Sequence, residues 1–244
     1  LFLVIIGVYF SLRENLSLKA GAISGLILIK PQYLLLIPPF FLIAKNKGRF
    51  LKGYTLSTAI LFFVSVAISG FGALILYPSF LLATEVPFFG SHPEHMFSLS
   101  PLIKAGVSRF GLADNISLPI NFLLYAVFIY LFSRQTKSLG RDMLFIIATV
   151  ASTAFAIHIV DHDLIIFLLP IYLLLAKAKE PSNKNSTIKK GYAIFLATAL
   201  FLIPYLYIFD MGPLAAVFFL ALSLYFLLAK GPYRVDVSEN TDLA

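Results

Sequence analysis

The chain has 244 residues, of which 59% are hydrophobic and 13% are charged, with a formal net charge of +7. Soluble domains carry about a quarter charged residues, so this composition excludes an ordinary soluble protein and makes lipid the solvent for much of the surface. The Lys and Arg residues lie in short gaps between apolar runs, which is typical of cytoplasmic membrane loops and argues against nucleic acid as a partner. The chain has no cysteine, which excludes disulfides.

The apolar runs predict an all-α fold, a polytopic transmembrane helical bundle of about nine membrane segments with one long outer loop. The chain starts at Leu1 inside an apolar run without a charged region before it. We therefore expect it to begin within a helix rather than with a signal peptide. We expect the bundle, truncated at its N-terminus, to fill residues 1–229, and residues 230–244 to form a disordered cytoplasmic tail. The expected segments are 1–12, 17–29, 33–44, 53–76, 118–133, 142–158, 164–176, 191–208 and 213–229.

Residues 20–44 allow two interpretations: two short segments that meet at Lys30-Pro31-Gln32, or one kinked span. Pro31 removes a backbone donor and disfavours helical geometry at Lys30. Two legs of about a dozen residues are short for a bilayer. A single span, however, leaves the Lys30 ammonium in the middle of the membrane, where it is costly unless paired. We favour a break at the outer surface.

The basic gaps predict the orientation of the chain. Lys and Arg residues crowd four gaps, at residues 45–52, 134–141, 177–190 and 230–234. The positive-inside rule places all four gaps in the cytoplasm. Alternation of the segments then puts residues 30–32, 77–117, 160–163 and 209–212 on the outer side of the membrane. All four His residues of the chain lie at or beside that face.

Part of the long loop at 77–117 reads as a short amphipathic helix. Ser100 suits the N-cap, Pro101 the first helical position, and Gly111 the end. The apolar residues that share one face of this helix are Leu99, Leu102, Ile103, Val107 and Phe110. Such a helix on the outer leaflet could hold a lipid-linked substrate. The alternative is an ordinary surface loop, and the sequence does not separate the two.

The same loop contains the stretch His92-Pro93-Glu94-His95. Two His residues and a carboxylate at this spacing can bind zinc. Pro93 interrupts the group, however, and no His-Glu-x-x-His helix is present. We favour a loop that meets a phosphate or sugar hydroxyls, and we expect no metal and no other cofactor.

The densest ionisable cluster lies between two apolar runs and contains His158, Asp161, His162 and Asp163. Ionisable residues at a membrane boundary are functional candidates. The alternative is a polar turn in which Asp163 caps the next helix. That alternative leaves His158 unexplained, so we favour a functional role. Lys30 is a further candidate: its ammonium could bind a phosphate, or it could simply snorkel towards water.

Three stretches of the sequence resemble glycosyltransferase family 87, a member of the membrane-embedded GT-C superfamily. Residues 21–32, followed by Leu36-Ile37-Pro38, resemble the family's "Gly…Gly…Lys-Pro-Gln…Pro" stretch. His162-Asp163-Leu164, before Leu168-Leu169-Pro170, resembles its "His/Tyr-Asp-Leu…Leu-Pro" stretch. Ser98-Leu99 is similar to its Ser-Leu motif, although Met96 and Phe97 replace the Asn and Gln that often precede it. The pattern covers most of residues 17–176.

The resemblance implies a cell-membrane enzyme that transfers a sugar from a polyprenyl-phosphate donor to a lipid-linked or glycan acceptor outside the cytoplasm. It also implies a catalytic Asp in the first outer loop, which would lie upstream of Leu1, so we expect this stretch alone to be inactive. The residues expected to bind the donor phosphate are Lys30, Gln32 and Arg109. Those expected to contact or support substrate are His92, Glu94, His95, His158, Asp161, His162 and Asp163.

Two other classes of protein compete with the enzyme. A secondary transporter or permease would gather its charges near the midplane on broken helices and usually shows two related halves. A non-catalytic membrane scaffold predicts no clustering of ionisable residues. Here the charges gather at one face and no internal repeat is present, which favours the glycosyltransferase, with membrane lipid as its surroundings.

Overall fold

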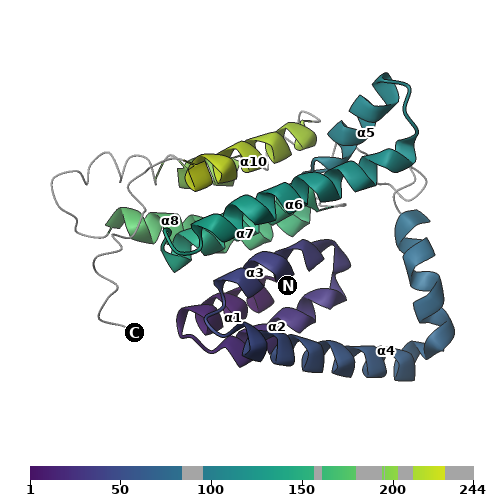
Figure 1. Ribbon diagram of the computed structural model, residues 1–244, viewed down its shortest axis with the longest axis horizontal. Helices are drawn as coiled ribbons and strands as arrows, with labels where there is room; N and C mark the ends of the chain where they lie inside the picture. Colours follow the sequence, from purple (N-terminus) through teal and green to yellow (C-terminus); the bar gives the residue numbers. More distant parts are fainter. Residues whose placement is uncertain (84–95, 157–160, 180–193, 195, 203–210, 229–244) are drawn as a thin grey trace.

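A computed structural model describes residues 1–83, 96–156, 161–179, 194, 196–202 and 211–228, and this part of the chain is almost entirely helical (Figure 1). The prediction of an all-α fold is therefore confirmed for these residues. The labelled α-helices are α1 (Phe2–Arg13), α2 (Ser17–Gly25), α3 (Ile37–Ile43), α4 (Lys47–Ala83), α5 (Ser100–Arg109), α6 (Ser117–Gln135), α7 (Arg141–Phe155), α8 (Leu168–Lys179) and α10 (Gly212–Leu228). Short 3-10 helices connect them: η1 (Leu26–Ile29), η2 (Pro31–Leu36), η5 (Asp114–Ile116) and η6 (Asp161–Phe167).

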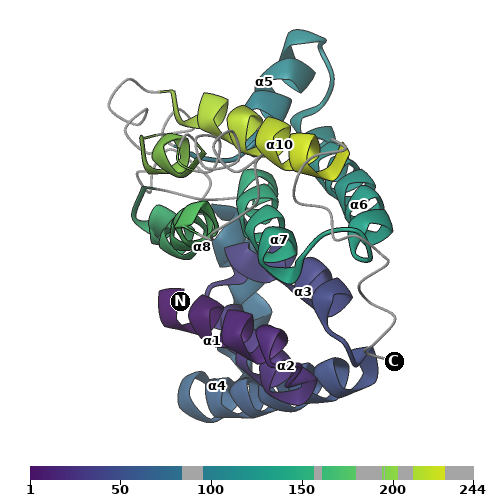
Figure 2. The ribbon, with the colours of Figure 1, turned by 90° about the vertical axis from the view of Figure 1, so that its left-hand side faces the viewer.

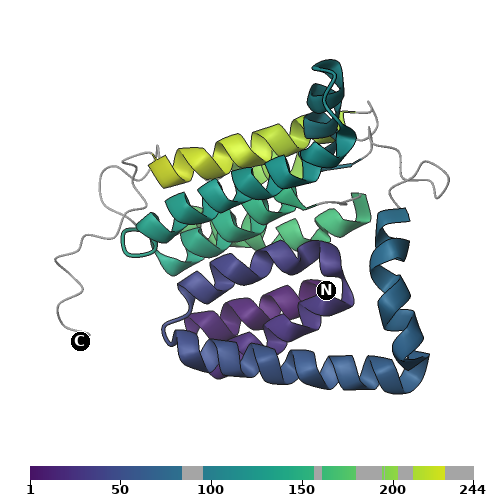
Figure 3. The ribbon, with the colours of Figure 1, turned by 45° about the vertical axis from the view of Figure 1, so that its right-hand side comes forward.

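The helices form two neighbouring groups, α1 to α4 and α6 to α10 (Figure 3). Helix α7 is the centre of the core, because every residue from Met143 to Phe155 is buried. Figure 2 shows α7 between α3 on one side and α10 on the other, and it contacts both. Aromatic rings fill the junction between the groups: Phe40 of α3 stacks on Phe145 of α7, with ring centroids 5.2 Å apart.

Two of the described helices are long and apolar enough to cross a membrane, Lys47–Ala73 and Ser117–Gln135. The other apolar helices in the described ranges have 10 to 17 residues, below the about 20 that a membrane-crossing helix needs. The structure therefore supports a membrane location but does not show the nine membrane segments that the sequence predicts. The expected segments at 1–12, 17–29, 33–44 and 164–176 are found as short helices, some of them extended by 3-10 turns.

Helix α4 differs from its expected bounds of 53–76. It starts earlier, at Lys47, and runs to Ala83 with a sharp kink at Gly70, whose φ is 77° and ψ 159°. Only glycine adopts this backbone conformation readily. Figure 3 shows the segment after Gly70 turning away from the first part of α4 and running across the end of the bundle. Residues 77–83, which the sequence assigns to the outer loop, are therefore helical.

The break at Lys30 is confirmed. Helix η1 ends at Ile29, Lys30 takes a non-helical conformation with φ −128° and ψ 84°, and Pro31 opens η2. The two legs, α2–η1 and η2–α3, pack against each other at this turn. Proline explains the break, since it removes the N–H donor and restricts the residue before it.

Two basic gaps lie at one end of the bundle. The Arg141 guanidinium donates to the Arg13 carbonyl oxygen at 3.1 Å, and the Asn46 N–H donates to Ser17 Oγ at 3.0 Å. These contacts bring the gaps at 45–52 and 134–141 to the same end, as alternation of the segments requires. The gap at 177–190 falls largely, and the tail at 230–244 wholly, outside the described residues. The membrane side of each end stays a prediction.

The amphipathic helix of the long loop is present as α5, one residue out of register with the prediction. Leu99 rather than Ser100 is the N-cap, and Pro101 is the second helical residue. The end is as predicted: Gly111 has φ 69°, and its N–H donates to the Ser108 carbonyl oxygen at 3.0 Å. A left-handed glycine that closes a helix in this way is a common C-terminal cap.

The predicted apolar face of α5 is correct only in part. Leu99 and Val107 are buried and Ile103 packs against the core. Phe110, expected on the same face, is 83% exposed. It is the C-cap residue, with φ −87° and ψ 7°, so the regular helical spacing ends there.

Helices α2 and α4 approach closely through glycines. A Cβ atom on Gly21 would lie 1.9 Å from the Phe50 carbonyl oxygen, and one on Gly53 would lie 2.1 Å from the Leu18 carbonyl oxygen. Small residues let membrane helices pack backbone against backbone, where van der Waals contact is the main attraction. The glycines thus fix the position of α2, which leads directly into the turn at Lys30.

We predict that Gly21→Ala and Gly53→Ala each destabilise the fold, by about 1–3 kcal/mol, because the added methyl group forces the helices apart. The measurement is thermal unfolding of the purified full-length protein in detergent. Gly72→Ala in α4 is the matched control, since its Cβ would meet nothing within 4 Å. An unchanged melting temperature for Gly21→Ala would contradict this account of the packing.

A second prediction concerns orientation. Because the chain has no cysteine, single cysteines can be introduced without background labelling. In intact cells, an impermeant maleimide should label Phe110→Cys on α5 and should not label Lys137→Cys between α6 and α7. After the cells are opened, both positions should react. Labelling of Lys137→Cys from outside would overturn the predicted topology.

Candidate functional site

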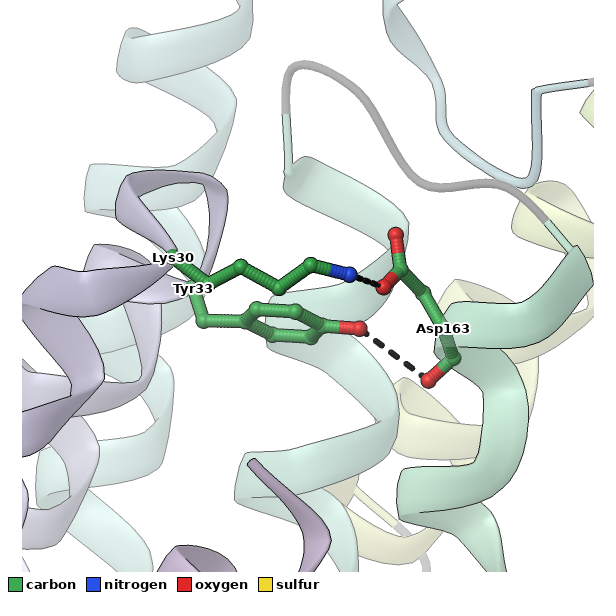
Figure 4. Close-up of polar contacts among 3 residues, drawn as sticks. All are labelled: Lys30, Tyr33 and Asp163. Carbon is green, nitrogen blue, oxygen red and sulfur yellow. Dashed lines mark hydrogen bonds and ion pairs between the residues drawn. The ribbon is translucent and has the colours of Figure 1, made fainter.

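The candidate site is a partly buried ion pair between two segments that are far apart in the sequence. The Lys30 ammonium pairs with the Asp163 carboxylate, across 133 residues of chain (Figure 4). The Asp163 side chain is 2% exposed, whereas that of Lys30 is 35% exposed. The structure therefore joins two of the sequence candidates, the turn at Lys30 and the cluster at 158–163, into one site.

Tyr33 is the third member of the site, and the sequence analysis missed it. Its hydroxyl donates to the Asp163 backbone carbonyl oxygen at 3.0 Å, and its ring centroid lies 5.8 Å from Lys30 Nζ (Figure 4). The Tyr33 N–H donates to the Lys30 carbonyl oxygen at 3.0 Å, so the first turn of η2 brings Tyr33 back beside Lys30. A tyrosine three residues after the lysine was the available signal, hidden within an apolar run.

Hydrogen bonds from α6 and α7 hold η2, the 3-10 helix that follows Lys30, in place. The Leu35 carbonyl oxygen in η2 accepts hydrogen bonds from the Tyr125 hydroxyl of α6 and from Ser152 Oγ of α7, the latter at 2.9 Å. A carbonyl oxygen has two lone pairs, and both are used here. Because η2 is held to both helices, the side chains that it carries have little freedom to move away from Asp163.

Asp163 does not sit at a helix N-cap. It is the third residue of η6 (Asp161–Phe167), so the capping explanation that the sequence offered is wrong. A buried carboxylate is costly unless it is paired and hydrogen-bonded. The Asp163 carboxylate forms an ion pair with the Lys30 ammonium, so Asp163 is the counter-ion of this lysine.

The arrangement leaves Lys30 able to bind an anion. An ammonium has three N–H donors, and Lys30 remains partly exposed. Asp163, in contrast, is buried and engaged, which makes it a poor base for abstracting a proton. The geometry therefore provides a cation held in a defined position, not a free carboxylate.

Nearby, the C-terminal end of α7 is closed by two other segments. The Leu99 N–H donates to the Ala154 carbonyl oxygen, and Asn121 Nδ2 donates to the Phe155 carbonyl oxygen, both at 2.8 Å. These bonds satisfy carbonyl groups that a helix end leaves open. Asn121 Oδ1 and Ser98 Oγ are buried, and neither has a hydrogen-bond partner among the residues that the structure describes. Ser98, one of the residues of the Ser-Leu stretch, is thus fully inside the protein.

The remaining sequence candidates are not joined to this cluster. Gln32 lies in η2, two residues after Lys30, and is half-buried, and Arg109 is exposed at the end of α5. No hydrogen bond or ion pair links either side chain to Lys30 or Asp163 among the described residues. Asp161 and His162 lie in η6, where only their backbone is described. The candidates outside the described residues are His92, Glu94, His95 and His158.

No group of three or more His, Cys, Asp or Glu side chains suited to a metal ion occurs within the part of the chain that the structure describes. The stretch at 92–95, which raised the question, falls outside that part. The expectation that no metal takes part therefore stays a prediction.

Comparison with known families assigns the chain. The model of glycosyltransferase family 87 matches residues 1–157. The chain belongs to glycosyltransferase family 87. The match includes the turn at Lys30 and the end of α7, and it stops before Asp163. No curated protein and no solved structure matches the chain significantly.

Membership of glycosyltransferase family 87 makes this a glycosyltransferase and, together with its apolar helices, supports a membrane location. The resemblance seen in the sequence is confirmed at the level of the family. Lys30 lies within the region that the family model matches, and its ion-pair partner, Asp163, lies just after the end of that region.

We predict that Lys30 and Asp163 are energetically coupled. Removing one partner from a fully buried pair costs about 3–5 kcal/mol. Because Lys30 is a third exposed, we expect a smaller coupling, of roughly 1–2 kcal/mol. The measurement is a double-mutant cycle of Lys30→Met and Asp163→Asn, read by thermal unfolding in detergent. Additive effects of the two substitutions would show that the pair contributes nothing to the fold.

Proposed function

We propose that this glycosyltransferase transfers a sugar from a polyprenyl-phosphate donor to a lipid-linked or glycan acceptor on the extracytoplasmic face, and that the Lys30 ammonium binds the donor phosphate. The observation that carries the proposal is the position of Lys30. It is a partly exposed cation, held by a buried counter-ion, at the end of the bundle opposite the basic gaps at 45–52 and 134–141.

The chemistry of transfer calls for a cation at this place. The acceptor oxygen forms a bond to the anomeric carbon while the bond from that carbon to the phosphate oxygen breaks. The phosphate leaves with the bonding electron pair, so its negative charge grows in the transition state. A fixed ammonium beside that oxygen stabilises the growing charge more than it stabilises the bound donor.

The acceptor hydroxyl loses a proton in the same reaction, and a base must take it. We assign this role to a carboxylate other than Asp163, because Asp163 is buried against Lys30. Asp163 is instead a positioning residue. Through Asp163 and Tyr33, the bundle holds the ammonium before the donor arrives, which reduces the reorganisation needed at the moment of reaction.

We assign supporting roles in substrate and membrane binding to Gln32 and Arg109. Gln32 lies in η2, two residues after Lys30, and its side-chain amide can donate to a phosphate or a sugar hydroxyl. Arg109 is the last residue of α5, and the C-cap residue that follows it, Phe110, is exposed. An exposed cation and aromatic ring on a short helix would suit contact with an anionic membrane surface.

The test is sugar transfer from a polyprenyl-phosphate donor by the purified full-length protein, normalised to folded protein. Lys30→Ala should lower kcat/KM by roughly 100-fold or more, because a fixed charged contact is typically worth a few kcal/mol in the transition state. Lys30→Arg should keep part of the activity, since the positive charge remains.

The matched control is Lys19→Ala. Lys19 is an exposed lysine on α2, near the other end of the same hairpin, and its removal should leave transfer unchanged. Asp163→Asn should reduce turnover at full donor concentration, and not only folding yield. Wild-type kinetics for Lys30→Ala would remove the lysine from the site and return it to a structural role.

A further inference from the structure

Two arginines meet at the end of the bundle opposite the site at Lys30. Arg13 is the last residue of α1, and Arg141 is the first residue of α7. The Arg141 guanidinium donates to the Arg13 carbonyl oxygen at 3.1 Å, across 128 residues of chain. Both residues are exposed. The contact brings two cations close to each other, where they repel unless negative charge lies nearby.

One carboxylate lies beside the two arginines, and it is already engaged. Asp142 follows Arg141 in α7, and its carboxylate accepts a hydrogen bond from the Tyr9 hydroxyl at 3.0 Å. The Arg13 side chain interacts with the same hydroxyl. Tyr9 is buried, so its bond to Asp142 fixes the inner side of the cluster. Two guanidinium groups and one carboxylate leave the cluster with a net positive charge.

The rest of this end of the bundle does not supply the missing negative charge. Besides the two arginines, its exposed cations among the described residues are Lys19, Lys45, Lys47, Arg49, Lys52, Arg134 and Lys137. Besides Asp142, the acid of the described residues at this end is Glu14, which is exposed in the turn between α1 and α2. A surface with such a surplus of one charge attracts a partner of the opposite charge.

Apolar side chains beside Arg13 favour a lipid over a soluble anion. Phe10, one helical turn before Arg13, is 49% exposed, and Leu16, three residues after it, is 39% exposed. Apolar groups next to cations are typical of a membrane boundary, where the former contact acyl chains and the latter contact phosphates. A soluble phosphate compound would gain from the cations but would leave these apolar groups in water.

We propose that Arg13 and Arg141 bind the phosphate group of an anionic membrane lipid. An arginine side chain has five N–H donors in a planar fork, and the fork fits two phosphate oxygens. Arg141 uses one nitrogen on the Arg13 carbonyl oxygen, which holds the side chain in place and leaves other donors for a ligand. The alternative, in which Arg141 only caps the C-terminal end of α1, accounts for that bond and leaves the surplus positive charge without a partner.

A lipid bound here would join the two groups of helices at a second place. Arg13 belongs to the first group, α1 to α4, and Arg141 to the second, α6 to α10. The pair of Lys30 and Asp163 joins the same two groups at the opposite end. A ligand that binds the folded protein and not the unfolded chain stabilises the fold, so this lipid should raise the melting temperature.

The experiment is thermal unfolding of the purified full-length protein in detergent, with phosphatidylglycerol or phosphatidylcholine added at the same concentration. Phosphatidylglycerol should raise the melting temperature. Phosphatidylcholine should raise it far less, because its own ammonium group neutralises its phosphate. Inorganic phosphate at that concentration should have no effect. An equal response to the two lipids, or to inorganic phosphate, would overturn the proposal.

A matched pair of double variants tests the arginines themselves, with bound lipid counted by native mass spectrometry. Arg13→Gln with Arg141→Gln should weaken phosphatidylglycerol binding by roughly 30-fold, about fivefold for each cation lost. Arg49→Gln with Lys52→Gln removes the same charge from exposed positions on α4 at the same end and should keep most of the binding. Equal losses in the two double variants would show only diffuse attraction between charges and would contradict the arginine site.

A conservative variant covers the case in which the glutamine pair fails to fold. Arg13→Lys with Arg141→Lys keeps both charges but replaces each fork by a point charge. It should bind phosphatidylglycerol more weakly than the wild type does, and binding as tight as that of the wild type would contradict the proposed contact. None of these measurements involves sugar transfer, so their outcome is independent of the proposed function.

Discussion

The pairing of Lys30 with Asp163 is the interaction on which the rest of the structure depends. An ammonium and a carboxylate in an apolar bundle are each costly alone, and each makes the other tolerable. Lys30 belongs to the first group of helices and Asp163 to the second, so the pair also fixes how the groups meet. Tyr33 reinforces the junction by bonding to the backbone of Asp163.

The surrounding structure serves to keep the turn at Lys30 in place. Close glycine packing sets α2 against α4, and the hydrogen bonds to Leu35 hold η2 on α6 and α7. The glycines at 21 and 25, which stood out in the sequence as part of a family pattern, therefore have a packing role: they let α2 come close enough to α4 to direct the turn. On the proposed function, this rigidity is what allows one lysine to meet a phosphate in a defined position.

The sequence predicted the local features of this site and missed the long-range ones. The break at Lys30 followed from proline, and the end of α5 from Gly111, because both act on their own stretch of backbone. The pairing of Lys30 with Asp163 spans 133 residues, and no local pattern encodes it. The kink at Gly70 was missed because a glycine within a long apolar run is compatible with a straight helix. Nine membrane segments were expected from hydropathy alone, whereas two of the described helices are long and apolar enough to cross a membrane. Hydropathy marks the apolar runs but does not give the length of the helix that each run forms.

A cryo-electron microscopy structure of the full-length protein with a non-transferable phosphonate analogue of the donor would show directly whether Lys30 meets the donor phosphate. We predict phosphonate oxygens within hydrogen-bond distance of Lys30 Nζ, with Asp163 still paired to the same ammonium. A head group bound elsewhere, with Lys30 and Asp163 paired and out of reach of the ligand, would contradict it and leave the pair a purely structural contact.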